Sequence, residues 1–231
     1  MAFATKPGTL GAIYMESNST TMTDEATTAN TAKTIFTITT AGHRLISLDP
    51  SDEPVVKYGT VPVVQTKWPT LTGLVGYEIN YATGAITFKN AAGAATTPGT
   101  EAVTITGKWI TMTLLPGFTK FSVDTSVGIH DVTQFVALAD GNYGWRRIIG
   151  ALGEWSSSAD GFIGNDDILA LVAIALSVPK HFQFVLDQTN TSSFLYGQGS
   201  CNKCDVDDSV AGVITQNLSI LSSSTLYRVV G

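Results

Sequence analysis

The sequence predicts a mainly β protein, a β-sandwich or partial barrel with one packed α-helix. Short β-branched runs are separated by turns along the whole chain, and serine, threonine and 22 glycines make up much of the remainder. A single segment has the apolar spacing of an amphipathic helix. The length of 231 residues suits one domain, or one domain that carries a sizeable insertion.

The N-terminal half is expected to hold short strands and one hairpin. The first thirty residues are expected to form loops, apart from a short strand over 10–15. The hairpin is the clearest signal, because apolar residues alternate on both arms of GYEINYATGAITF, and Gly84 can take the positive φ of its turn. Other alternating or β-branched runs predict strands over 34–39, 54–58, 61–66 and 102–114. Residues 20–110 therefore have the pattern of a compact β unit.

Beyond Pro116 the sequence predicts further strands and the single helix. Asn165 is a suitable N-cap, the two aspartates that follow favour the positive end of the helix dipole, and an apolar face extends from Ile168 to Leu176. Pro179 ends the helical pattern. The expected strands are 118–125, 181–187 paired with 192–200, and the closing runs 210–221 and 225–230.

Composition limits the possible classes of function. Charged residues are only 14% of the chain and hydrophobic residues are 44%, which suggests that much of the surface is covered by other subunits. Thirteen basic residues against nineteen acidic ones give a net charge of −6, which argues against a dedicated DNA-binding protein. No apolar run approaches the length of a membrane-spanning helix, and we expect neither a signal peptide nor a membrane partner.

No motif of catalysis or metal binding is convincing. The sequence lacks a G-x-S-x-G elbow, a Walker loop and an HExxH motif. The acidic run at Asp205, Asp207 and Asp208 lacks the glycine and distal glutamate of a calcium loop, so we expect an exposed acidic turn. Cys201 and Cys204 have no second CxxC or suitably spaced histidine, and we expect structural thiols in a reducing cytoplasm. We therefore expect no enzyme, no cofactor and no metal site.

Two features of the segment NYGWRRIIGALGEWSSSADGF leave alternatives open. Arg146 and Arg147 suit either a solvent-facing pair with one intramolecular carboxylate partner, or a subunit contact in which a guanidinium binds a neighbour's carboxylate. Trp155 alternates with small residues on one strand face, which suits either a core residue or an anchor at a subunit interface.

The same region resembles the tail tube proteins, or major tail proteins, of long-tailed bacteriophages. The resemblance lies in ordered motifs that continue through the expected helix and FLYGQGSC to the closing STLYRVVG. It covers about residues 116–231 and, more weakly, GTLGAIYM near the N-terminus. One departure is Ser157, which stands where glycine is common in the family. The first motifs in order are Asp131-Val132-Thr133, Gly144-Trp145, the arginine pair, Ala151-Leu152 and Trp155-Ser156-Ser157-Ser158 with Gly161.

The resemblance implies a structural virion protein of the phage tail, made in the host cytoplasm. Its subunits would form rings, expected to be hexameric, whose sheets join into a continuous inner β-barrel, and the rings would stack into a hollow tube. Residues 1–19 and 111–231 would form the tail-tube core domain. Residues 20–110 would be an inserted module, either on the outer surface or contributing core strands. The implied partners are further copies of the chain, tape measure, tail terminator and tip proteins, and double-stranded DNA that passes without specific binding.

Charge placement suggests which residues face such a lumen. Residues 16–110 hold six basic and eight acidic residues, while the rest of the chain holds seven basic and eleven acidic ones. An acidic wall would repel phosphate and let DNA slide. The candidates for that wall are Asp124, Glu154 and Asp160. Two rival hypotheses remain, namely another non-enzymatic virion component, such as a capsid decoration or head-tail joining protein, and a β-sandwich carbohydrate-binding module.

Overall fold

The computed structural model describes residues 11–63, 76–90, 92–98, 102–115, 117–132, 147–162, 178–186, 191–208 and 214–230. Within these ranges the chain is mainly β, with thirteen strands joined in antiparallel pairs and two short 3-10 turns. The predicted fold class is thus confirmed as to its β content. The expected helix over 165–176 lies outside the described residues. No helix in the described part of the chain is long and apolar enough to span a bilayer.

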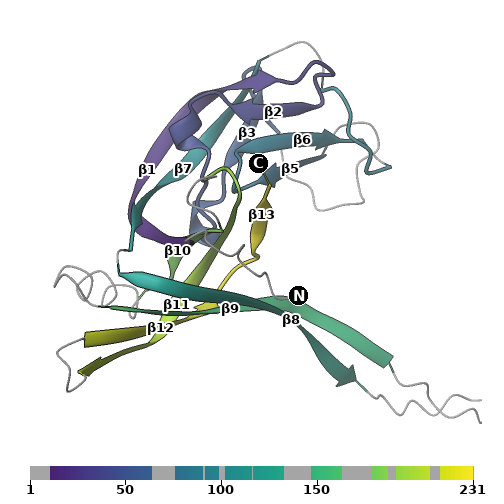
Figure 1. The fold of residues 1–231 in the computed structure, drawn as a ribbon. Coiled ribbons are helices and arrows are strands. Elements are labelled where there is room, and N and C mark those ends of the chain that lie inside the picture. The colour runs from purple at the N-terminus through teal and green to yellow at the C-terminus, as the bar shows by residue number, and fades with distance from the viewer. Residues whose placement is uncertain are drawn as a thin grey trace, which may run out of the picture.

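Seven strands form a lower sheet, drawn across the middle and bottom of Figure 1. Their order across the sheet is β7-β1-β10-β11-β12-β9-β8, with β13 paired to β11. Both strands at one end, β8 and β9, come from the segment that resembles tail tube proteins. The bounds are β1 Ala12–Ala29, β7 Val103–Leu114, β8 Phe118–Val132, β9 Arg147–Phe162, β10 Lys180–Val185, β11 Phe194–Asp208, β12 Ile214–Ser222 and β13 Tyr227–Val229.

The remaining strands form an upper module around the far ends of β1 and β7 (Figure 1). β1 and β7 pair along most of their length, from Tyr14↔Leu114 in the lower sheet to Ala26↔Thr104 in the module. The module is therefore joined to the lower sheet by two continuous strands. Its other strands are β2 Ile35–Ile38, β3 Val55–Tyr58, β4 Val61–Val63, β5 Gly76–Asn80 and β6 Ala85–Lys89, and its 3-10 turns are Ala41–His43 and Pro50–Asp52.

The expectation of loops over residues 16–29 is wrong, because this segment is the greater part of β1. Side chains from Ser17 to Thr21 are exposed on both faces of the strand, so the hydrophobic alternation that marks a strand is missing. Pairing with β7 nevertheless holds the segment extended, with register shifts after Glu16 and Met22. Asp24, next to the second shift, has a φ of 48°.

The predicted hairpin is confirmed. β5 and β6 pair from Gly76↔Lys89 to Asn80↔Ala85, and Gly84 in the turn has a φ of 62°. Tyr77, Ile79, Ile86 and Phe88 are all buried, as the alternation predicts. A Cβ on Gly84 would lie 3.0 Å from Ile38 Cδ1, so the turn requires glycine for both its backbone conformation and its packing.

Buried hydrophobic residues form two separate clusters. One lies in the lower sheet and includes Ile13, Trp155, Phe182 and Phe184. The other lies in the upper module. Its members lie on strands β1, β2, β3, β5, β6 and β7 and in the loop after β2. Those members are Met22, Phe36, Ile38, Ile46, Val56, Tyr77, Ile79, Ile86, Phe88, Val103 and Ile105. β1 changes cluster between Met15 and Met22, which is the region where the sequence analysis places the start of the inserted module.

Two buried side chains of the lower sheet bind the backbone of the module. The Tyr196 hydroxyl donates a hydrogen bond to the carbonyl oxygen of Ile46 at 2.8 Å. The Leu48 N–H donates to His181 Nε2 at 2.7 Å, so the proton of this neutral ring is on Nδ1, which contacts Glu16 Oε2 at 2.8 Å. The ring of Tyr196 stacks on that of His181. These contacts fix the module against the lower sheet next to β7, because the same loop also bonds that strand through the Ser47 N–H to the Lys108 carbonyl and the Ile110 N–H to the Leu45 carbonyl.

Cys201 and Cys204 lie in β11 and are not disulfide-bonded. Burial, and secondarily the neighbouring Cys204, raise the pKa of the Cys201 thiol to about 12. At pH 8 the reactive thiolate should therefore be roughly a thousandfold rarer than for an ordinary cysteine. In a Cys204→Ser variant, we expect a disulfide reagent to label Cys201 only after denaturant is added. Stoichiometric labelling of the folded variant at the rate of a free thiol would contradict this burial.

Candidate assembly surface

The lower sheet ends in a long two-stranded ribbon made of β8 and β9. The two strands pair from Phe118↔Gly161 to Val132↔Arg147. β12 covers only the C-terminal part of β9, from Ser156 to Phe162, and the Ser222 hydroxyl then accepts a hydrogen bond from the Trp155 N–H. Beyond that point the ribbon projects past the rest of the sheet, as the lower right of Figure 1 shows.

β8 presents an open strand edge. It is the last strand in the order of the sheet and pairs only with β9 among the described residues. The opposite end of the lower sheet is also open, because β7 beyond Ile110 pairs only with β1 in this part of the chain. Unpaired N–H and C=O groups on a long edge are a template for pairing with another chain. The described chain thus offers one such edge at each end of the same sheet.

The two faces of the ribbon differ in polarity. On the inner face Val123, Trp155, Ser157 and Ala159 are buried against the core of the lower sheet. On the outer face every described position is polar, and the Ser122 and Ser158 hydroxyls form a cross-strand hydrogen bond of 2.8 Å. The outer-face residues are Lys120, Ser122, Asp124 and Ser126 on β8 and Glu154, Ser156, Ser158 and Asp160 on β9.

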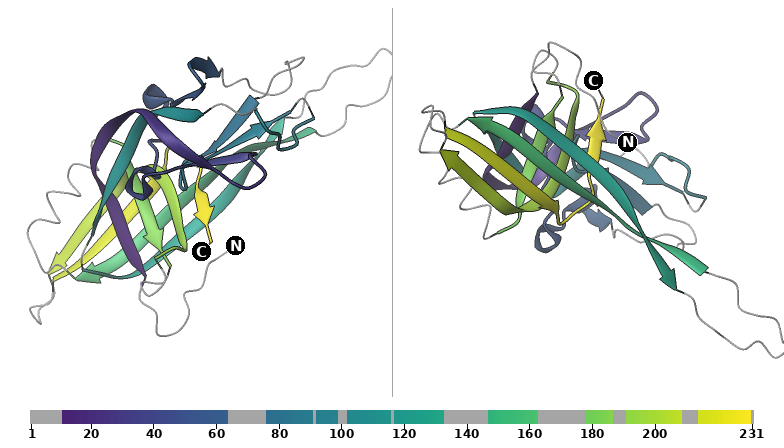
Figure 2. Two further views of the ribbon diagram at one scale, coloured as in Figure 1. Left: turned by 90° about the horizontal axis from the view of Figure 1, so that it is seen from above. Right: turned by 60° about the horizontal axis from the view of Figure 1, so that its bottom comes forward.

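The three carboxylates that the sequence analysis selected all lie on this outer face. Asp124, Glu154 and Asp160 are exposed and are brought together by the β8–β9 register. The amide of Asn217, on β12, donates to Asp160 Oδ1 at 2.5 Å. β12, β9 and β8 lie side by side, with this face toward the viewer, in the right-hand view of Figure 2. We call the outer side of these three strands, which is polar except for Leu221 on β12, the ribbon face.

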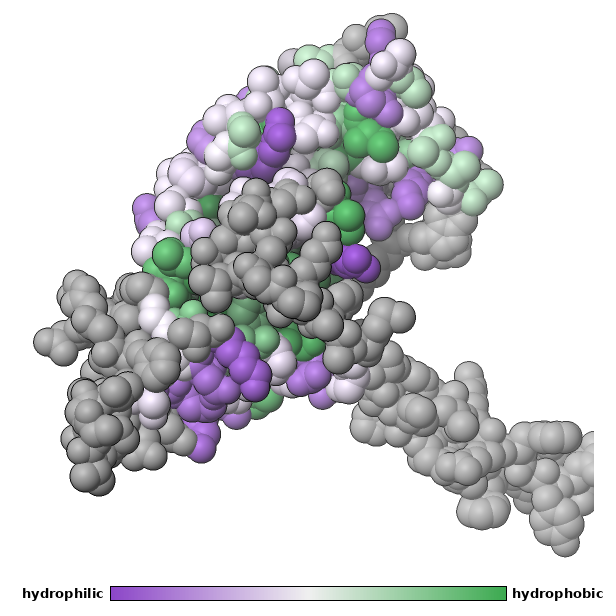
Figure 3. Space-filling model, in the orientation of Figure 1, coloured by the Kyte–Doolittle hydropathy of each residue, from purple (hydrophilic) through white to green (hydrophobic). Residues whose placement is uncertain are grey.

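The ribbon face extends onto β11. Lys203 pairs with Ser219, which in turn pairs with Ser158, so one row of side chains crosses three strands. Hydrophilic residues gather at the lower end of the described surface in Figure 3, where these strands lie in the same orientation. Among the residues whose side chains are described, the charged ones on this face are three carboxylates and two lysines, Lys120 and Lys203, among many hydroxyl groups. The β11 register also places the backbone positions of Asp205 and Asp207 on this face, opposite Asn217 and Thr215.

Of the two interpretations of Trp155, the structure shows the buried one. Its side chain is 3% exposed within a single chain, its Nε1–H donates to the Ser224 carbonyl at 2.9 Å, and its ring meets Phe184 edge to face. The glycines of FLYGQGSC make room for it. A Cβ on Gly197 would lie 2.8 Å from Trp155 Cζ2, and one on Gly199 would lie 3.1 Å from Cη2. Trp155 therefore has no side-chain surface left for a neighbouring subunit.

Several other predicted residues are only partly described or not described. Arg146 lies outside the described residues, and Arg147 is described only as the first backbone position of β9. Only the backbone is described for the acidic run at Asp205, Asp207 and Asp208. This backbone continues strand β11, so the expectation of a turn is wrong. Ser157, which replaces the family's usual glycine, is buried, and its hydroxyl has no hydrogen-bond partner within the described chain.

No described group of side chains has the arrangement of a catalytic or metal centre. The described residues include no cluster of three His, Cys, Asp or Glu side chains that could hold a metal ion. Glu16 and His181 are the most buried acid–base pair among the described residues, and both are held by structural contacts. Burial would raise the pKa of Glu16, but hydrogen bonds from the side chain and backbone of His181, with the charge of Lys180, hold this pKa below its usual value. No local sequence pattern indicates this pair, because its members are 165 residues apart.

Comparisons with known proteins add a limited structural likeness. No family model and no curated protein matches the sequence. Among solved structures, the tail of an empty GTA particle with C6 symmetry aligns over 52% of this chain and 87% of its own, with 18% identity and a TM-score of 0.40. The virion of a native gene transfer agent (GTA) particle aligns over 52% of this chain and 89% of its own, with 17% identity and a TM-score of 0.39. These values are too low to establish a common fold, so function has to be argued from the geometry of this chain.

Proposed function

We propose that this chain is a structural subunit that assembles into stacked rings, forming the hollow tail tube of a phage-like particle through which double-stranded DNA passes. The observation that carries the proposal is the β8–β9 ribbon, which combines an open edge with a polar outer face and a buried inner face. The ordered sequence motifs of this ribbon, which resemble those of tail tube proteins, support the same conclusion. That resemblance is also the source of the expected partners, including tape measure, terminator and tip proteins.

Ring formation follows from joining the two open edges of the lower sheet. If β8 of one subunit pairs with the open end of β7 on the next, the contact is head-to-tail, and such contacts form a ring when the rotation closes. Closure pairs every strand edge and gives a continuous inner barrel. Leu114, at the open end of β7, is a large apolar residue that is 42% exposed in the single chain, and such a contact would cover it.

The ribbon face suits the wall of a DNA conduit. In a closed ring its side chains would be repeated by every copy around the axis. Hydroxyl groups offer no fixed positive charge to phosphate, and the three carboxylates exceed the two lysines in each copy. A wall of this kind repels DNA weakly and holds no phosphate in place, as passage requires.

Proline substitutions at neighbouring positions of β8 test the edge contact. Thr125 and Ser126 are both exposed and regularly paired, to Trp155 and Glu154. Successive N–H groups of a strand point to opposite sides, so one proline removes an N–H that faces β9 and the other removes one that faces the open edge. We expect the variant whose missing N–H faced the open edge to keep the parent's melting temperature. It should need about tenfold more protein to assemble, as measured by sedimentation.

Thr125→Ala and Ser126→Ala serve as matched controls, because they keep both N–H groups. We expect both alanine variants to assemble as the parent does. If every folded proline variant assembles at the parent's concentration, β8 does not pair with a neighbouring subunit.

The division into a core domain and an inserted module is tested by a deletion. Thr21 and Lys108 are register partners in β1 and β7, so removing residues 22–107 and joining this pair through Asn-Gly should close a regular hairpin. The deletion uncovers Tyr196 and His181, and we expect lower stability but retained tube formation by electron microscopy. A deletion variant that folds, as judged by circular dichroism, but never assembles while the parent does would show that the module contributes core strands.

A further inference from the structure

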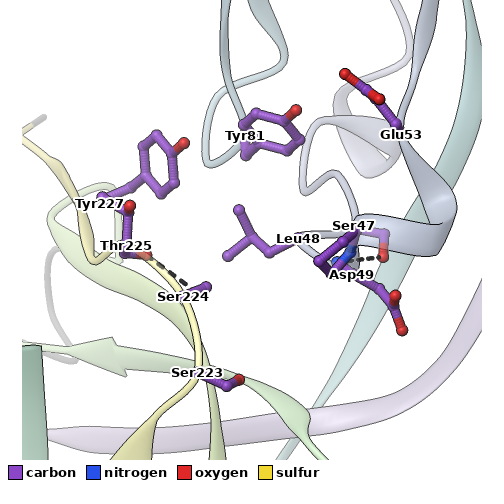
Figure 4. A pocket seen from close by; sticks show the side chains of 10 residues that line it. Ser47, Leu48, Asp49, Glu53, Tyr81, Ser223, Ser224, Thr225 and Tyr227 are labelled. Carbon is purple, nitrogen blue, oxygen red and sulfur yellow. Dashed lines mark hydrogen bonds between the residues drawn. The ribbon is translucent and has the colours of Figure 1, made fainter. Parts of the chain in front are cut away.

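A cavity of about 410 Å³ lies between the upper module and the C-terminal segment, away from the ribbon face. The loop that contains the second 3-10 turn lines one side, the turn after β5 contributes Tyr81, and the segment before and within β13 lines the other side, ending at Tyr227 (Figure 4). The C-terminal wall is more than 140 residues away in sequence from the other two elements. The contacts of Leu48 and Ile46 with the lower sheet fix the distance between the walls. We call this cavity the tyrosine pocket.

Two tyrosine rings form its aromatic wall. The Tyr81 and Tyr227 ring centroids are 5.7 Å apart, with the ring planes inclined at 45°. Figure 4 shows both rings on the same side of the cavity, beside the Leu48 side chain. Burial raises the pKa of both hydroxyls, and the charge of Glu53 adds to this effect at Tyr81. The rings therefore stay neutral at physiological pH, and both of these electron-rich rings line the cavity.

The hydroxyl groups on the lower side of the pocket are mostly committed to the protein itself. Ser47 Oγ donates to Asp52 and accepts from the Asp49 N–H. Ser224 Oγ accepts the Gln198 N–H, and the Ser223 hydroxyl is directed at the Gln198 side chain. These groups are not available to bind the many hydroxyls of a saccharide in a directional way.

Apart from the hydroxyls of Tyr81, Thr225 and Tyr227, the remaining polar groups of the pocket are two carboxylates. Glu53 is exposed at the rim and makes no ion pair within the described chain. Asp49 uses Oδ1 to accept both bonds from Ser51, which leaves its other oxygen. Among the described residues no basic side chain lines the pocket, and Lys108, whose charge acts on Asp49, is paired with Asp52 at 2.6 Å. Two carboxylates and two aromatic faces in one cavity would repel an anion and attract a cation that carries only donors.

We propose that the tyrosine pocket binds an alkylammonium or guanidinium group, placed against the Tyr81 and Tyr227 rings with Glu53 as its principal carboxylate partner. The group comes either from a free amine or from a lysine or arginine side chain of another copy of the chain. This site is separate from the ribbon face, and its binding of a free amine by the dispersed subunit does not depend on tube formation. A single contact of this kind is weak in water. The same contact repeated by every subunit of an assembly adds up to strong binding.

The test uses L-arginine ethyl ester, which has a guanidinium and an ammonium group and no carboxylate, on the dispersed full-length subunit at low salt. NMR of the tyrosine rings should show a saturable shift of the Tyr81 and Tyr227 signals. Glu53→Gln should weaken the apparent affinity about tenfold, and Tyr81→Leu should do the same. Asp24→Asn, which removes one negative charge from the same module outside the pocket, should leave the affinity unchanged.

Three results would overturn the proposal. They are the absence of a saturable shift, a shift that Glu53→Gln leaves unaltered, and an equal response to methyl glucoside, which would indicate a saccharide site. Equilibrium dialysis against assembled protein then identifies the source of the cation. Exclusion of the ester from assemblies means that a neighbouring copy fills the pocket, and equal binding to both forms means that the natural ligand is a free amine.

Discussion

Replacing Trp155 with alanine is expected to lower the free energy of unfolding by about 3–5 kcal/mol. The indole is 3% exposed, meets Phe184 edge to face and lies against the two glycines of β11. Its removal opens a cavity at the junction of β9, β11 and β12 and leaves the Ser224 carbonyl without its indole donor. Urea unfolding followed by circular dichroism measures the loss.

Two further variants separate the causes. Trp155→Phe keeps an aromatic ring but removes the Nε1–H donor, and we expect a loss of about 1–2 kcal/mol. Leu221→Ala truncates a side chain that is 49% exposed on the ribbon face, and we expect a change within about 0.5 kcal/mol. If Trp155→Ala costs no more than Leu221→Ala, Trp155 is not part of the core and the interface hypothesis for it should be reopened.

The second large effect is expected from reversing the charge of the ribbon face. Replacing Asp124, Glu154 and Asp160 together with lysine changes the charge by two units at each position in every copy. All three side chains are exposed, so we expect the variant to fold and assemble. Tubes assembled with short duplex DNA at low salt should then retain nuclease-protected DNA. Retention should fall steeply as salt rises, because each lysine–phosphate contact releases counterions.

A matched control places the same charge change on the upper module. Asp24, Glu53 and Glu78 are exposed there, and their replacement with lysine should attract DNA only to the outside of the tube, where nuclease removes it. Protected DNA in the control but not in the ribbon-face variant would mean that the module faces the lumen. Tubes of the ribbon-face variant that protect no more DNA than the parent would show that this face does not line a conduit.

Local signals made part of this fold predictable. The hairpin of β5 and β6 follows from short-range alternation and a glycine at the turn, and both are visible in thirteen letters of sequence. Much of β1 was not predictable in this way. Its polar residues are exposed on both faces, and the segment is a strand because β7, more than eighty residues away in sequence, pairs with it.

The candidate surface was predictable only in part for the same reason. Glu154 and Asp160 are an even number of residues apart, so strand geometry alone places them on one face of β9. That Asp124 joins them depends on the register between β8 and β9, which the sequence does not determine. The glycines at positions 197 and 199 were recognised as a motif, but their reason, space for Trp155, needs the three-dimensional arrangement. The tyrosine pocket joins three distant segments, and no local pattern indicates it.

Electron cryomicroscopy of the concentrated parent protein tests ring assembly most directly. The proposal predicts closed rings stacked into hollow tubes, with β8 of each subunit paired to a neighbour's sheet edge and with Asp124, Glu154 and Asp160 directed at the axis. Particles that remain single subunits at high concentration, or rings in which the ribbon face points outward, would contradict it.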